Sequence, residues 1–395
     1  MDTNFDFVHE RRNSASKKWD NVKEHFETEK NVLPMWVADM DFKAPSPVIK
    51  ALKERTEQGI YGYTIQTESH LNSMINWFKE KHNWSIHKDW ISHSPGIIPA
   101  LSLIIQTFTK PNDKIIVQSP VHHAFYRVIN LQERIAIENQ LQIKNGHYSM
   151  DFEDLEKKLN NGAKILILCN PHNPVGRVWT KEELVKIGEL CLKYNALVIS
   201  DEVWCDIVYE PNMHTPYASI SSDFANHSIT CVSPSKTFNL MGIKSSEIIT
   251  PNQLLHERIK KSLETFFLSA PNFFSVIASE SAYNKGGEWL NSLLEYLEKN
   301  IQYITHFLNN NMPEVKLTKP EGTYLAWLDF RSLKISNEKL QNIFIEEANV
   351  GLEQGTIFGT GGEGFLRLNF ACPLSVLEKG LNSINKVLKE NDLIN

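Results

Sequence analysis

Between residues 97 and 250, short apolar runs rich in β-branched residues alternate with longer segments whose apolar residues recur at helical spacing. The short runs predict strands at Lys114–Gln118, Lys164–Cys169, Ala196–Ser200, Ser228–Val232 and Glu247–Thr250. The flanking and intervening segments predict helices at Ile97–Phe108, His123–Leu131, Phe152–Leu159 and Lys181–Tyr194. This alternation predicts an α/β fold with a mostly parallel sheet covered by helices on both faces.

The pattern changes after about residue 285. It then predicts a long helix, two strands and a closing helix, at Glu288–Asn309, Tyr324–Asp329, Gly364–Phe370 and Leu374–Lys389. These elements indicate a second, smaller α+β domain, which a chain of 395 residues is long enough to contain. We expect a large domain over residues 46–285 and a small domain formed by residues 1–45 and 286–395.

Composition narrows the class of protein. Hydrophobic residues make up 42% of the chain and charged residues 22%, as in an ordinary globular protein, and the net charge of −6 argues against a nucleic-acid or anionic-membrane partner. No apolar run reaches the ~20 residues that a bilayer requires, and the N-terminus lacks the apolar stretch of a secretory signal. The five cysteines are scattered and form no CxxC pair, which favours reduced core thiols over a zinc site. We therefore expect a cytoplasmic protein without a metal.

Polar residues stand directly after the predicted strands, at the edge where sheets of this kind bind ligands. In Ser233–Gly242 (SPSKTFNLMG), Lys236 offers an amine that can form an imine with an aldehyde, and Ser233 and Ser235 can bind a phosphate. Taken alone, a solvated lysine in a turn is the favoured interpretation. Asp201 ends an apolar strand, so its carboxylate needs a donor or a cation such as a protonated pyridine nitrogen. A helix cap or a structural ion pair explains it about equally well.

Two further strand ends carry turn-forming residues. In LCNPHNPVGR, Asn173 can donate its amide N–H to a phenolate oxygen, although Asn-Pro pairs also form ordinary turns. In SPGIIPAL, Gly96 permits a sharp turn, and the free N–H groups of Ile97 and Ile98 can bind phosphate; an ordinary helix start is the alternative. Together the four strand ends supply what one cofactor needs: phosphate donors, an oxygen partner, a carboxylate and an imine-forming lysine.

These motifs resemble, in order and spacing, the fold-type I enzymes that depend on pyridoxal 5'-phosphate (PLP), the aspartate aminotransferase superfamily of class I/II. The matching motifs are NPxNPxG at Asn173, DE at Asp201 and SxSK at Lys236. Within this superfamily the chain is most similar to the cystathionine β-lyase, or C–S lyase, branch. That similarity rests on stretches from nearly the whole chain: KKWD, WVADMDF, YGYT, GTYLAWLDFR and GFLRLNFACP.

The resemblance implies a role for each matching residue. Lys236 would hold PLP as a Schiff base and carry the proton, Asp201 would pair with the pyridinium nitrogen, and Asn173 would contact the ring oxygen. The remaining cofactor contacts would come from Gly96, Ile97, Ile98, His122, Ser233, Ser235 and Lys244. Arg367 would clamp the α-carboxylate of the substrate in a bidentate fork, with Ala38 and Asn173 also beside the substrate. Tyr63 would act in catalysis at the cofactor of a partner subunit, which implies a homodimer with shared sites.

Four positions depart from the family pattern. His122 replaces the usual tyrosine of PVYxxF and can both stack and titrate, and Trp204 replaces the histidine of DEIH. Lys244 replaces a common arginine but can still neutralise phosphate as a point charge. Glu247 would weaken phosphate binding unless its carboxylate points away. These departures bear on substrate preference and activity more than on the fold.

The lyase resemblance implies cleavage of the Cβ–S bond of cystathionine or another cysteine S-conjugate by α,β-elimination, giving a thiol, pyruvate and ammonia. A class I/II aminotransferase uses the same residues and is the main alternative. A binding or regulatory protein on the same scaffold is a third possibility. Retention of Lys236, Asp201, Asn173 and Arg367 argues against it, because a pure scaffold needs no imine-forming lysine.

Overall fold

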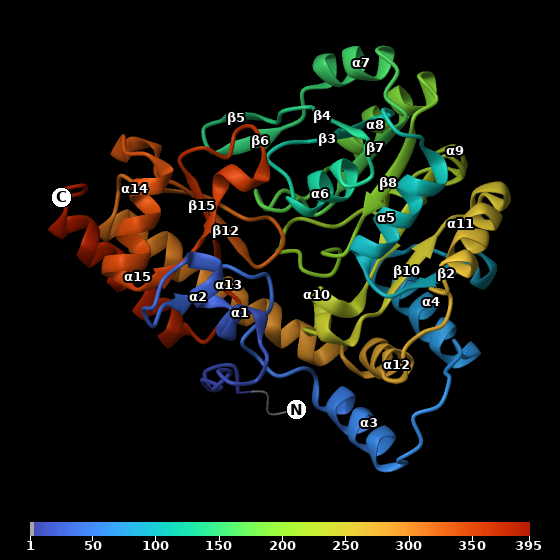
Figure 1. Cartoon of the computed structure of the whole chain (residues 1–395), viewed down its shortest axis with the longest axis horizontal. Helices are drawn as coiled ribbons and strands as arrows, with labels where there is room; N and C mark the ends of the chain where they lie inside the picture. Colours follow the sequence, from blue (N-terminus) through green and yellow to red (C-terminus); the bar gives the residue numbers. More distant parts are fainter. Residues whose placement is uncertain (1–3) are drawn as a thin grey trace.

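The computed structural model describes residues 4–395 and contains a seven-stranded sheet with strand order β2-β10-β9-β8-β7-β3-β4 (Figure 1). In that order the strands are Ile91–Ser94, Ser246–Ile249, Ser228–Val232, Leu197–Asp201, Ile165–Cys169, Lys114–Val117 and Ile135–Glu138. The last five are parallel, and β10 is antiparallel to both β9 and β2. Strand β2 therefore runs in the direction of the parallel set, and the carboxyl ends of β2, β7, β8 and β9 lie at one edge.

Side-chain alternation along the strands explains the helices on both faces. In β7, Leu166 and Leu168 pack with α7 (Phe152–Asn160) and α8 (Lys181–Lys193), whereas Ile167 packs on the opposite face with α5 (Ile97–Phe108). Every residue of β7 is buried, as expected for a strand covered on both sides.

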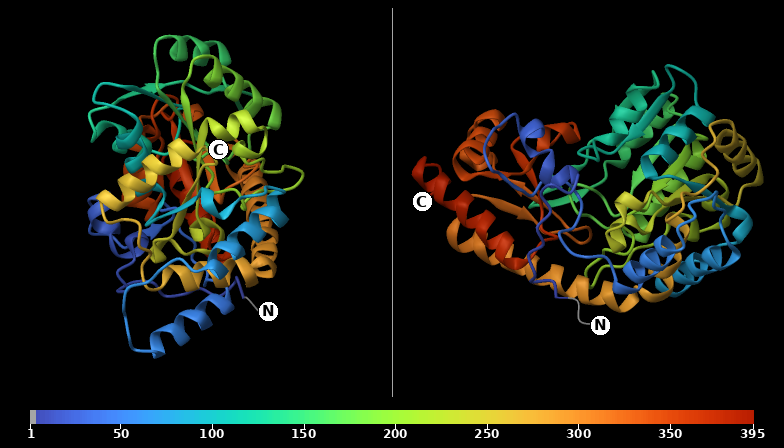
Figure 2. Two further views of the ribbon diagram at one scale, coloured as in Figure 1. Left: turned by 90° about the vertical axis from the view of Figure 1, so that its right-hand side faces the viewer. Right: turned by 60° about the horizontal axis from the view of Figure 1, so that its bottom comes forward.

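A second, antiparallel sheet has the order β11-β12-β15-β14. Its strands are Lys316–Thr318, Leu325–Asp329, Phe365–Asn369 and Glu353–Gln354. Nearby, β1 (Leu33–Pro34) pairs with β13 (Val350–Gly351), so the N-terminal segment lies against the C-terminal part of the chain. The long helix α13 (Gly287–Asn311) runs beneath both sheets (Figure 2). The proposed domain boundaries themselves stay a prediction.

The chain contains further α-helices and β-strands outside these elements. They are α1 (Lys17–Asp20), α2 (Val22–Phe26), α3 (Ser46–Glu57), α4 (Glu68–His82), α6 (Ala124–Asn130), β5 (Gln142–Lys144), β6 (His147–Ser149), α9 (Ser222–Asn226), α10 (Pro234–Phe238), α11 (Gln253–Thr265), α12 (Ser275–Lys285), α14 (Asn337–Asn342) and α15 (Leu374–Glu390). The predicted α/β class with a smaller α+β part is confirmed. Within residues 4–395, no helix has the length and apolar character needed to cross a membrane.

Candidate active site

A cavity of about 230 Å³ lies where the carboxyl ends of β2, β7, β8 and β9 meet. Each of these strands contributes one predicted residue to its wall: Gly96, Asn173, Asp201 and Lys236. The full lining consists of Ala38, Pro95, Gly96, Ile97, Ile98, Pro99, His122, Cys169, Asn173, Asp201, Val203, Trp204, Ser233, Ser235, Lys236, Met241, Lys244 and Ser245. The geometry thus brings together all of the predicted site residues except Arg367, which borders this group, and Tyr63.

Lys236 lies on the short helix α10, which begins immediately after β9. The hydroxyl of Ser233 caps that helix by accepting a hydrogen bond from the backbone N–H of Ser235. The Nζ of Lys236 donates to the carbonyl of Ala38 at 2.6 Å and lies 5.1 Å from the ring centre of Trp204. Burial lowers the pKa of Lys236 to about 8. At pH 7 about a tenth of the amine is therefore uncharged, far more than for an ordinary lysine, and the uncharged form is the one that a nucleophile or base requires.

Asp201 ends β8 inside the cavity, where its carboxylate accepts a hydrogen bond from the backbone N–H of Val203 at 3.2 Å. Burial raises the pKa of Asp201 to about 7, and the nearby Glu202 adds to this effect. The charge of Lys236 only partly opposes that rise. A cationic ligand atom would stabilise the ionised form of a carboxyl group that burial otherwise disfavours. The site therefore fits a protonated ring nitrogen.

Arg367 comes from the centre of β15 and is buried beside the cavity. Its Nη1 donates to Asn173 Oδ1 at 3.0 Å, and its Nη2 donates to the carbonyl of Trp36 at 2.9 Å. Nε finds no hydrogen-bond partner within residues 4–395. Burial lowers the pKa of Arg367 to about 10, which leaves it charged at neutral pH. A buried guanidinium with an unused donor is suited to bind a carboxylate.

Four of the residues that line the cavity have the features of a phosphate site. Gly96 adopts φ 153° and ψ 163°, a backbone conformation that essentially only glycine reaches, and the next residue begins α5. The hydroxyl of Ser233 donates to that of Ser235 at 2.8 Å. Lys244 is exposed at the rim, where its charge can face an anion. A helix N-terminus, two hydroxyls and a lysine fit the phosphate of PLP.

Three departures from the family pattern have a structural explanation. Burial holds the pKa of His122 well below its ordinary value, so this ring is neutral at physiological pH and suited to stacking. Trp204 packs edge-on against Tyr324, with ring centres 4.6 Å apart. Glu247 pairs with His93 at 3.4 Å and accepts from Gln66 at 3.0 Å, outside the cavity lining. Its carboxylate therefore does not face the phosphate end.

Two sets of contacts close to Lys236, made by Tyr324 and Asp206, are not predicted from the sequence. The hydroxyl of Tyr324 donates to the Ala38 carbonyl at 3.1 Å, beside the lysine contact. Asp206 accepts from Thr237, the neighbour of Lys236, at 2.7 Å, and from His82 at 2.8 Å. Asp206, His82 and Cys205 lie close enough to hold a metal ion, but these hydrogen bonds already satisfy the carboxylate. Residue types alone do not reveal such contacts, because the partners are far apart in sequence.

The similarity to known proteins extends beyond the cavity residues to nearly the whole chain. The family described as aminotransferase class I and II matches residues 30–384. Cystathionine beta-lyase PatB from Bacillus subtilis (strain 168) is 45% identical over 98% of this chain and 100% of its own length.

Two solved structures are similar throughout. A PLP-bound candidate aminotransferase from Clostridium difficile 630 has a TM-score of 0.96 at 46% identity, covering 98% of this chain and 100% of its own. The PLP-bound C–S lyase from Staphylococcus hominis has a TM-score of 0.92 at 33% identity, covering 98% of both chains. Full-length agreement of sequence and structure shows that this chain belongs to the aminotransferase class I and II family.

Proposed function

We propose that this protein is a PLP-dependent carbon–sulfur lyase. It cleaves the Cβ–S bond of cystathionine or a related cysteine S-conjugate, giving a thiol (homocysteine from cystathionine), pyruvate and ammonia. The observation that carries the choice of lyase is the 45% identity to a cystathionine β-lyase along the whole of both chains. The cavity supports the cofactor, because it combines a buried amine of lowered pKa with a buried carboxyl group and an anion-binding end.

Lys236 has two tasks in this reaction. Bound at Lys236, PLP supplies an aldehyde for covalent attachment and an electron sink for the Cα carbanion. With substrate bound, the free amine of Lys236 would accept the Cα proton at Nζ. The carbonyl of Ala38, which lies 2.6 Å from Nζ, can accept a hydrogen bond from the ammonium group so formed. Removal of the Cα proton at Nζ is the step that this chain would contribute toward release of the thiol, with pyruvate and ammonia as the other products.

The other residues hold the reacting groups in place. Asp201 would keep a proton on the ring nitrogen of bound PLP, and Asn173 would contact its ring oxygen. Arg367 binds the substrate α-carboxylate, and its fixed contact with Trp36 limits how far that carboxylate can shift. His122, neutral because it is buried, would stack on the ring.

We further propose a homodimer in which Tyr63 completes the site of the partner subunit. The Tyr63 side chain is fully exposed, and Ile60, Tyr61 and Ile65 around it are also at least 60% exposed. An exposed apolar segment of this kind is suited to burial against a second copy. This arrangement explains why Tyr63 is absent from its own chain's cavity.

Mixing two inactive variants tests the shared site. We expect Tyr63→Phe and Lys236→Ala to be nearly inactive alone. After unfolding and refolding together they should recover roughly a quarter of wild-type activity, because half of the dimers then contain one intact site of two. As a control, Lys236→Ala mixed with Asp201→Ala should recover none, since both changes damage the site of their own chain. Equal recovery in the two mixtures would exclude the shared site.

A pyruvate assay on L-cystathionine with purified, PLP-loaded protein tests the proposed reaction. We expect pyruvate to accumulate without any added keto acid. A yellow, PLP-loaded protein that forms no pyruvate from any cysteine S-conjugate would refute the lyase assignment.

A further inference from the structure

Residues 36–42 form an irregular segment between β1 and α3 that passes directly beside Lys236. The segment has no regular hydrogen-bonding pattern of its own, so its backbone groups must be satisfied from elsewhere. Asn369, at the end of β15, donates to the carbonyls of Val37 and Asp39 at 2.6 and 2.5 Å. Side chains distant in sequence therefore fix the conformation of this segment.

The inner side of the 36–42 segment contacts both residues proposed to act on substrate. The carbonyl of Ala38 accepts from Lys236, and the carbonyl of Trp36 accepts from Arg367. A shift of this segment would displace the proton-carrying amine and the carboxylate clamp together.

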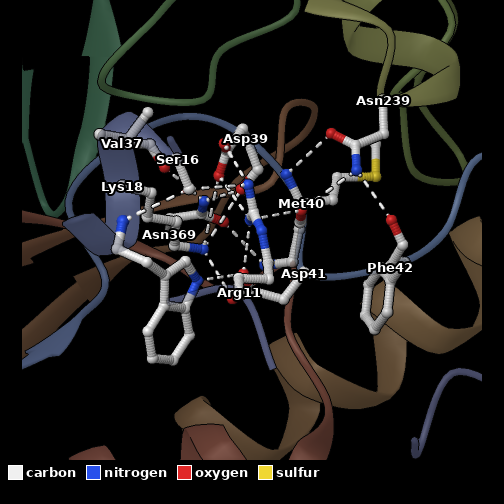
Figure 3. Close-up of polar contacts among 12 residues, drawn as sticks. Arg11, Ser16, Lys18, Val37, Asp39, Met40, Asp41, Phe42, Asn239 and Asn369 are labelled. Atoms are coloured by element: carbon white, nitrogen blue, oxygen red, sulfur yellow. Dashed lines mark hydrogen bonds and ion pairs between the residues drawn. The ribbon is translucent and has the colours of Figure 1, made fainter. Parts of the chain in front are cut away.

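The outer side carries two carboxylates paired with two cations (Figure 3). Arg11 donates from Nη2 to Asp39 at 2.9 Å and from Nη1 to Asp41 at 2.7 Å. Lys18 donates to Asp41 at 2.7 Å, and Trp19 Nε1 donates to the same carboxylate at 2.9 Å. We call Arg11, Lys18, Asp39 and Asp41 the charge cluster.

Two members of the charge cluster, Lys18 and Asp41, are buried, whereas Arg11 and Asp39 are partly exposed. The side chain of Lys18 is 1% exposed and that of Asp41 is 6% exposed. Burial alone would raise the pKa of Asp41, but the charge and hydrogen bond of Lys18 hold it below the usual value. Removing one partner of a buried pair leaves an uncompensated charge, so the cluster resists rearrangement.

A second contact joins the segment to the helix that carries the lysine. Asn239, the C-cap of α10, accepts from the backbone N–H of Met40 at 3.1 Å. It also donates to the carbonyl of Phe42 at 2.8 Å (Figure 3). Lys236, its helix and the 36–42 segment therefore form one connected unit.

We propose that the charge cluster is a positioning device for Lys236: it fixes the Ala38 carbonyl as the hydrogen-bond acceptor of Lys236 Nζ and sets the electrostatic balance around that nitrogen. No residue of the cluster lines the cavity, so each acts through the segment and not on substrate. The inference rests on the proposed attachment of PLP to Lys236, but not on whether the reaction is elimination or amino transfer.

The charges around Lys236 determine in which direction a substitution in the charge cluster should shift protonation of the Lys236 nitrogen. Asp39 and Asp201 favour its protonated form, whereas Arg367 opposes it, and the buried His122 ring stays neutral. Arg11 compensates part of the negative charge of Asp39. Loss of Arg11 should therefore favour protonation at the Lys236 nitrogen, and loss of the Asp39 charge should disfavour it.

The test is a pH titration of the absorbance of bound PLP, which reports protonation of the Lys236 nitrogen in its linkage to the cofactor. We expect Arg11→Met to raise the midpoint and Asp39→Asn to lower it, each by about 0.5–1 pH unit, the size of one charge acting through partly solvated protein. Arg11→Lys should restore a midpoint near that of the wild type. As a control, Thr28→Val removes a different N-terminal tether, the 3.0 Å bond to Glu346, and should leave the midpoint unchanged.

Shifts of the titration midpoint in opposite directions distinguish a cluster that positions Lys236 from one that only stabilises the fold. If Arg11→Met and Asp39→Asn shift the midpoint in the same direction, or if neither shifts it in a PLP-loaded protein, the inference is wrong. If wild-type protein shows no absorbance band from PLP at Lys236, the proposed cofactor attachment fails first. The two failures are therefore distinguishable.

Discussion

Replacing Lys236 with alanine is expected to abolish trappable attachment of PLP and to lower kcat by at least about 10⁴-fold, the upper range for loss of a general base. The physical reason is the position of Nζ, which is buried in the cavity with a lowered pKa and an acceptor at 2.6 Å. The measurement is borohydride reduction of the loaded protein, followed by peptide mass mapping of the labelled lysine.

Lys244 provides a matched control for this experiment, because its side chain lines the same cavity. Lys244→Ala should weaken PLP binding but leave the reduced adduct on Lys236. An adduct on Lys244, or an undiminished adduct in Lys236→Ala, would show that the wrong lysine has been assigned.

Replacing Asp201 with alanine is expected to lower kcat by about 10²–10³-fold, a typical cost of losing one preorganised electrostatic partner. Some PLP should remain bound, because the phosphate contacts and Lys236 are untouched. Without the carboxylate the ring nitrogen loses its proton and accepts charge poorly. Steady-state kinetics on protein of measured PLP content separates lost catalysis from lost cofactor.

Arg367→Ala gives the contrasting result in the same assay. It removes the carboxylate clamp, so KM should rise for every amino acid substrate, while the cofactor spectrum stays close to that of the wild type. Near-wild-type kcat in a folded, loaded Asp201→Ala protein would contradict the role given to Asp201.

Local patterns predicted the large sheet well, because its strands are short apolar runs and its helices have clear periodicity. The predicted range Ile97–Phe108 coincides with α5, and Ser228–Val232 coincides with β9. Strand β4 was not predicted, and the strand implied before SPGIIPAL, which is β2, was given no range, since IAIE and ISHS are short and mix polar with apolar residues. The order of the strands in the sheet determines which motifs lie next to one another. The position of the cavity could therefore be predicted from the residues at the strand ends.

The 36–42 segment and its contacts were beyond sequence reasoning. The WVADMDF motif was recognised by resemblance, but its conformation depends on Arg11, Asn239 and Asn369, which are scattered through the chain. Likewise, the orientation of Glu247 depends on His93, a partner on a neighbouring strand. Polar contacts between residues far apart in the chain produce no periodic pattern in the sequence. The packing of strands and helices does produce one, in the spacing of their apolar residues.

The most direct test of the lyase assignment is the partition of products from one substrate. PLP-loaded protein is incubated with L-cystathionine, with and without an added keto acid, and thiol, pyruvate and amino transfer to the keto acid are quantified together. The lyase assignment predicts equal amounts of thiol and pyruvate, formed at the same rate with or without the keto acid and faster than any amino transfer. Amino transfer that dominates while no thiol appears would contradict it and establish an aminotransferase.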